Sequence, residues 1–155
     1  MRKFTMIILL AVGFLSELPG CAPVKMPAVN LASPQWHVRR GQAIWKPGPG
    51  RMEFTGDLLV AQNTEGDVWI SLTKSLLPIF TARTWDNTWS INFVKRGESH
   101  SGHGKPPYHR FIWFFIPDIL NGTPPPPEWE AAQKDDEFSL RNVRTGEEIK
   151  MVFDS

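Results

Sequence analysis

Cysteine and tyrosine are scarce in this 155-residue chain, and its net charge is small. It has one cysteine, one tyrosine, and 17 basic against 16 acidic residues. A single cysteine excludes an intramolecular disulfide framework. The balanced charge lacks the basic footprint of nucleic-acid binders, so we expect no nucleic-acid partner. It also gives no reason to expect strong adhesion to anionic lipid headgroups.

The sequence has no apolar run long enough to span a bilayer, which needs about 20 residues. Its longest such run covers residues 6–15, after the basic start Arg2-Lys3 and before the small residue Gly20. A basic start, a short apolar run and a small residue before the cleavage point are typical of a secretory signal peptide. We therefore expect residues 1–20 to be removed.

The end of that leader, Leu18-Pro19-Gly20-Cys21, resembles the bacterial lipobox. The resemblance implies that Cys21 carries lipid, including palmitate, and starts the mature chain; Pro19 departs from the usual Ala, Ser or Thr. Two or more acyl chains hold a protein stably on a membrane. Ala22, where Asp would retain an enterobacterial lipoprotein in the inner membrane, favours the outer membrane facing the periplasm. Plain secretion is the alternative.

The mature chain is predicted to be one β-rich domain, residues 36–155, behind a proline-containing tether, residues 21–35. Apolar and polar residues alternate with the period of two that indicates half-buried strands. The pattern predicts a mostly β (α+β) protein, namely a curved antiparallel meander sheet or half-barrel of about seven strands. The expected strands cover residues 42–45, 52–60, 68–73, 79–85, 88–94, 137–142 and 148–153.

One short helix is expected within residues 111–121, after a polar loop at residues 95–108. Phe111, Phe114, Phe115 and Ile119 have helical spacing. Pro117 would kink this helix unless it lies in the first helical turn. The absence of alternating strands and helices argues against a doubly wound nucleotide-binding fold.

The lipobox, the meander and the late helix together resemble the LolA/LolB-like envelope proteins. The residues that carry the likeness are Phe54-Thr55-Gly56 and the segment 115–124, which ends in Gly122-Thr123-Pro124. The resemblance implies an incomplete β-barrel plugged by helices, with a cavity for acyl chains of lipoproteins in transit. The domain is shorter than is usual in that family, so strands or plug helices are expected to be missing. Leu76-Leu77 is either the family's exposed leucine loop or a buried turn.

No group of residues predicts an active site, so we expect a non-enzymatic protein without cofactor or metal. His100, His103 and His109 could hold zinc, but they lie in a glycine-rich loop without a known zinc spacing. The Gly102–Lys105 stretch lacks the full phosphate-loop form, and no Gly-x-Ser-x-Gly elbow is present. The acidic run at residues 135–137 is interpreted as a solvated turn rather than a calcium site.

Aromatic side chains are the abundant feature, with seven Trp and ten Phe. Apolar pockets with few polar groups suit acyl chains. The sequence therefore predicts binding of an apolar ligand, acyl chain or lipoprotein in the concave face of the sheet. The predicted ligand-binding residues are Trp69, Trp89, Ile91, Phe93, Phe114 and Phe115. The alternative is a scaffold or protein-interaction lipoprotein with a filled core and an exposed apolar patch near Trp69 or Trp129.

Overall fold

The computed structural model describes residues 26–154; the predicted signal peptide and Cys21 lie outside these residues. The strands are β1 (Trp36–Lys46), β2 (Phe54–Asn63), β3 (Val68–Lys74), β4 (Leu77–Trp85), β5 (Thr88–Phe93), β6 (Glu98–His103), β7 (Trp129–Lys134), β8 (Glu137–Asn142) and β9 (Glu148–Phe153). The helical turns are η1 (Val94–Arg96), η2 (Ile112–Phe115) and α1 (Ile116–Leu120). Among the described residues no helix is long and apolar enough to cross a membrane.

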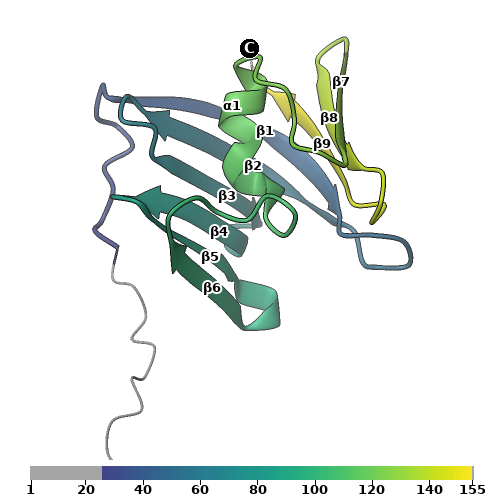
Figure 1. Cartoon of the computed structure of the whole chain (residues 1–155), viewed down its shortest axis with the longest axis horizontal. Coiled ribbons are helices and arrows are strands. Elements are labelled where there is room, and N and C mark those ends of the chain that lie inside the picture. Colours follow the sequence, from purple (N-terminus) through teal and green to yellow (C-terminus); the bar gives the residue numbers. More distant parts are fainter. Residues whose placement is uncertain (1–25, 155) are drawn as a thin grey trace, which may run out of the picture.

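All nine strands form one open antiparallel sheet in the order β6-β5-β4-β3-β2-β1-β9-β8-β7 (Figure 1). The first six strands make a meander, and the last three attach to the free side of β1. The predicted mostly β fold with one short helix is confirmed, with nine strands in place of about seven.

Strands β6 and β7 account for the difference in number. β6 lies within the residues predicted as a loop, 95–108, and β7 follows the proline run at residues 124–127. Both are edge strands and are largely exposed. An edge strand with little buried surface needs no apolar alternation, and so the period of two does not reveal it.

The helix lies across the face of the sheet that we call concave (Figure 1). Its first turn, η2, is a 3-10 turn, and α1 then carries Pro117 in its first turn, as its missing N–H permits. The helix ends at Asn121, and Gly122 takes a left-handed φ of 94°. η2 and α1 thus place six buried residues against the strands, namely Ile112, Trp113, Phe114, Ile116, Pro117 and Ile119.

Aromatic rings fill the centre of the core. Trp45 stacks on Phe93 with ring centroids 5.8 Å apart and meets Trp113 edge-on at 5.6 Å. Phe80 lies 4.3 Å from Trp113 and is fully buried. Such ring pairs stabilise a core beyond the area that they bury. Helix and sheet therefore meet without an open space at this point.

Two glycines lie where a neighbouring strand approaches too closely for a side chain. A Cβ at Gly41 would overlap the carbonyl oxygen of Val152, and one at Gly56 would overlap that of Thr73. The β3–β4 register also shifts between Leu72 and Thr73. A glycine within a strand often marks such a close approach of another backbone or an irregularity in the pairing.

The residues before β1 contact the convex face of the sheet. Met26 Sδ lies 3.6 Å from Ser90 Oγ, and Arg83 Nη1 donates to the Pro27 carbonyl at 3.4 Å. Thr64 N donates to the Gln35 carbonyl oxygen at 3.1 Å. The described part of the expected tether, residues 26–35, is thus attached to the domain at several points.

Candidate ligand-binding groove

Two hollows lie beside α1 on the concave face of the sheet. The first has a volume of about 530 Å³ and lies between α1 and the strands β1 and β2. It is lined by His37, Val38, Arg39, Val60, Gln62, Pro117, Leu120 and Asn121.

The second hollow, of about 650 Å³, lies between α1 and the C-terminal strands. It is lined by Arg39, Ile119, Leu120, Gly122, Gln133, Asp135, Asp136, Phe138, Val152 and Phe153. Because both hollows include Arg39 and Leu120, they adjoin one another. We call the two together the α1 groove.

Apolar side chains form one wall of the α1 groove. Leu120, Phe138 and Phe153 are only half-buried, whereas Ile119 and Val60 are buried. Phe153 pairs with Gly41 across the β1–β9 pair, on the side of the sheet that carries the groove. These partly exposed rings offer a surface to an apolar ligand.

A polar network ties the end of α1 to the sheet. Arg39 Nη2 donates to Asn121 Oδ1 at 3.1 Å, and Gln62 Nε2 donates to Asp118 Oδ1 at 2.9 Å. Asn121 Nδ2 lies 3.5 Å from Gln62 Oε1. The helix end is thereby held over β1 and β2, which keeps the first hollow open at its rim.

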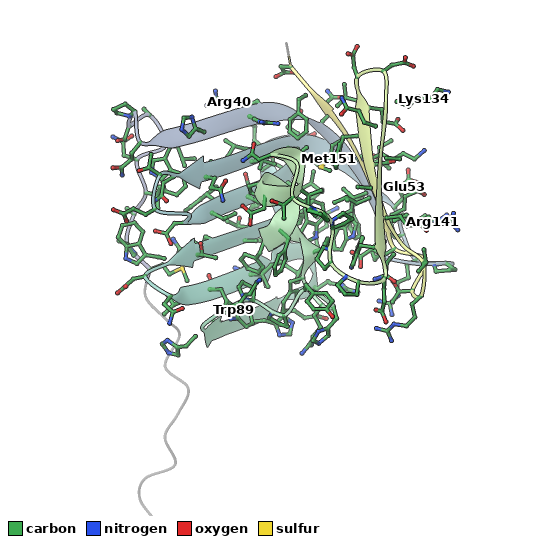
Figure 2. The ribbon with its side chains drawn as sticks, turned by 45° about the horizontal axis from the view of Figure 1, so that its top comes forward. Arg40, Glu53, Trp89, Lys134, Arg141 and Met151 are labelled. Carbon is green, nitrogen blue, oxygen red and sulfur yellow. The ribbon has the colours of Figure 1, made fainter. Side chains whose placement is uncertain are left out.

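The aromatic residues predicted as the ligand site lie elsewhere. Ile91, Phe93 and Phe114 are buried, and Trp89 and Phe115 are half-buried. Trp89 contacts Phe114 with centroids 5.9 Å apart, and it also contacts Phe111 at 5.6 Å. None of the predicted residues lines the α1 groove. The five of them named above pack on the core between the sheet and η2 (Figure 2, where Trp89 is labelled).

Trp69, the sixth predicted residue, lies on the convex face opposite Val68 and Ile70. It is half-buried, and the guanidinium carbon of Arg83 lies 5.5 Å from its ring centroid. Burial lowers the pKa of Arg83 from its ordinary value. Trp129, the other proposed centre of an exposed patch, is buried with 6% of its surface accessible, so that part of the expectation is wrong.

The three histidines do not converge. His100 packs against Phe111 with ring centroids 5.2 Å apart, while His103 and His109 are exposed. Across residues 26–154 no three His, Cys, Asp or Glu side chains are grouped to hold a metal ion. The acidic run forms the β7–β8 turn, where Asp135 has a φ of 52°.

The groove residues were not predicted because the expected first strand began at residue 42. The structure extends β1 back to Trp36, and this extension places Arg39 on the same face as Ala43 and Trp45. An arginine on the inward face of a strand, opposite Val60 of β2, was therefore the missed signal. The inward position of Arg39 can be recognised only when the start of β1 is known.

The fold and groove define a mostly β protein with one open, curved sheet and an elongated hollow beside its helix. No model of a known protein family matches the chain, and no curated protein matches it significantly. Geometry and chemistry must carry the functional argument.

Proposed function

We propose that this chain is a lipid-anchored protein of the bacterial envelope that binds an acyl chain or a similar apolar ligand in the α1 groove. The observation that carries the proposal is the half-buried apolar wall of Leu120, Phe138 and Phe153 on the concave face of an open sheet. The resemblance to the LolA/LolB-like proteins points in the same direction. We place the protein at the outer membrane, facing the periplasm and held by lipid on Cys21.

The size and chemistry of the groove suit such a ligand. Its hollows of about 530 and 650 Å³ fall within the range of small-molecule sites, roughly 300–1,000 Å³. Apolar side chains and polar or charged groups share its lining, as an amphiphile with a polar head and an apolar chain requires. An acyl chain would gain about 0.8 kcal/mol for each CH₂ that it buries.

Ligand binding can be tested with the mature chain carrying Cys21→Ser, which blocks acylation. We expect a fluorescent fatty acid to bind and unlabelled palmitate to displace it. Leu120→Asp should abolish uptake because it puts a charge in the apolar wall. Leu77→Asp is the matched control, since Leu77 is 68% exposed and outside the groove. No uptake by the unsubstituted groove would refute the proposal.

The anchor requires a separate test in cells. Labelled palmitate should be incorporated into the wild-type chain and recovered in the membrane fraction. Cys21→Ser should lose both the label and the membrane attachment, because no other cysteine is present. A Cys21→Ser protein that still carried palmitate would overturn the assignment of the anchor.

A second candidate function, a protein-interaction lipoprotein, is favoured by the β3–β4 turn. Leu76 at its tip is 95% exposed and Leu77 is 68% exposed. The filled aromatic core also fits a scaffold better than a deep lipid cavity would. A photo-cross-linker at position 76 should then capture a protein in cells, and a cross-linker at the exposed Ala132 should not. Recovery of lipid alone at both positions would exclude this candidate.

A further inference from the structure

We propose that the α1 groove selects amphiphiles with an anionic oxygen headgroup, and that Arg39 binds this headgroup. The inference rests on the proposed function, because it names the class of ligand for the same groove. It makes a distinct claim, since a groove that bound acyl chains by apolar contact alone would not distinguish charged from neutral headgroups.

Arg39 occupies the centre of the region. It lines both hollows of the α1 groove, which among their lining residues is otherwise true only of Leu120. Its neighbour across the β1–β2 pair is Val60, and Leu120 and Phe153 line the same hollows. A permanent positive charge thus lies where the strand pattern would otherwise place an apolar residue.

The guanidinium of Arg39 has unused donors. Within residues 26–154 no carboxylate oxygen lies within 4.0 Å of it, and its only side-chain hydrogen bond goes to the Asn121 amide oxygen. A guanidinium has five N–H donors in a planar fork that matches carboxylate and phosphate. The nearest described acid on α1, Asp118, already accepts a hydrogen bond from Gln62.

The charges around the groove give the ligand a direction. His37 and Arg39 lie at the β1 side of the groove, while Asp135 and Asp136 lie at the far rim on the β7–β8 turn. An anionic head is attracted to Arg39 and repelled from the acidic rim. The chain would then lie along Leu120, Phe138 and Phe153, between these two ends.

Arg40 provides a matched control. It follows Arg39 on β1, is also exposed, and lines neither hollow of the α1 groove. Its side chain lies on the opposite face of the sheet because side chains alternate along a strand. Arg39→Gln and Arg40→Gln therefore remove the same charge from the two faces. Gln retains a donor for the Asn121 amide oxygen, so the first variant need not release the end of α1.

The test compares the affinities of palmitate, hexadecyl phosphate and neutral hexadecanol for the mature Cys21→Ser chain and for these two variants in that background. We expect Arg39→Gln to lower the affinity for palmitate at least tenfold and to change the affinity for hexadecanol less than twofold. It should also remove the salt dependence of palmitate binding. Arg40→Gln should leave both affinities within twofold. Asp135→Asn with Asp136→Asn should tighten palmitate.

The outcomes separate the two proposals. If no ligand binds the unsubstituted chain, the proposed function fails and this inference fails with it. If all three bind but Arg39→Gln weakens them equally, the groove binds acyl chains and Arg39 only positions α1, which overturns the headgroup assignment alone. Tighter binding of hexadecyl phosphate than of palmitate would indicate that the natural ligand is a phospholipid. Equal binding of the two would indicate that Arg39 accepts the oxyanion of a free fatty acid or of a phospholipid. Both outcomes support the headgroup assignment.

Discussion

Trp45 and Glu147, which are 102 residues apart in sequence, are joined by a hydrogen bond in which Trp45 Nε1 donates to Glu147 Oε1 at 2.8 Å. Trp45 is 4% exposed and lies at the centre of the aromatic core. Its indole nitrogen needs an acceptor, and the turn before β9 supplies one. The bond thus joins the core of the meander to the C-terminal hairpin.

This carboxylate should make stability depend on pH. Burial raises the pKa of Glu147, although the Trp45 hydrogen bond and the charge of Arg51 oppose the rise. A carboxyl whose folded pKa exceeds its unfolded value costs stability as the pH rises from the unfolded to the folded pKa. Glu147→Gln keeps an acceptor for Trp45 and loses this cost. The free energy of unfolding of Glu147→Gln, relative to that of the wild type, should therefore increase as the pH rises from about 4.

Urea unfolding at several pH values measures that difference. Gln42→Ala, at an exposed position of β1, changes no titratable group and is the control, so its difference from the wild type should be the same at every pH. A constant difference for Glu147→Gln as well would contradict the raised pKa.

Replacing Gly41 by alanine should destabilise the domain by about 3 kcal/mol. The added Cβ would overlap the Val152 carbonyl oxygen and lie 2.7 Å from Phe153 Cα, so β1 and β9 would have to separate. Gln42→Ala, on the next and exposed position of β1, should change the unfolding free energy by less than about 0.5 kcal/mol. Chemical denaturation of the two variants decides; equal midpoints would show that the strand pair tolerates a side chain.

Truncation of Phe93 should mainly lower stability, whereas truncation of Leu120 should mainly weaken ligand binding. Phe93 is 7% exposed and stacks on Trp45, so Phe93→Ala should cost about 3–5 kcal/mol of stability. Leu120 is half-buried at the groove, so Leu120→Ala should cost about 1 kcal/mol and weaken fatty-acid binding. Unfolding curves and ligand titrations, read together, check both. Lost binding with unchanged stability in Phe93→Ala would instead support the aromatic site predicted from the sequence.

The β3–β4 turn is a site where the fold can be stabilised. Ser75 and Leu76 have φ values of 50° and 67°, and a left-handed conformation costs a non-glycine residue about 1–2 kcal/mol. Leu76→Gly removes that cost and loses no buried surface, so the unfolding free energy should rise by about 1 kcal/mol. Leu77→Gly, within β4, should lower it. Differential scanning calorimetry distinguishes the two; a drop for Leu76→Gly would show that Leu76 stabilises the turn.

Several features of the fold were predictable from sequence because they are local. The alternation of Val68, Ile70 and Leu72 set the inward face of β3, and all three are buried. The Asp86-Asn87 turn has positive φ at both residues, which short polar side chains tolerate. The short helix followed from the helical spacing of Phe111, Phe114, Phe115 and Ile119, with Pro117 tolerated in its first turn.

Edge strands and the groove were not predictable in this way. Burial in β6 is confined to the half-buried His100 and Gly102, and the sequence pattern there resembles a loop. Whether the concave aromatic residues left a cavity depended on the path of η2, which brings Trp113 within 5.6 Å of Trp45. Such contacts join residues far apart in the chain.

The sequence by itself determined the strand periodicity, the hairpin turns and the helix near Pro117, since each depends on neighbouring residues. Only the tertiary structure decided that the aromatic side chains fill the core and that Arg39 lies among apolar residues beside α1. The physical reason is that a hollow is the space left between distant segments. Its position depends on how the sheet curls and on where the helix crosses it.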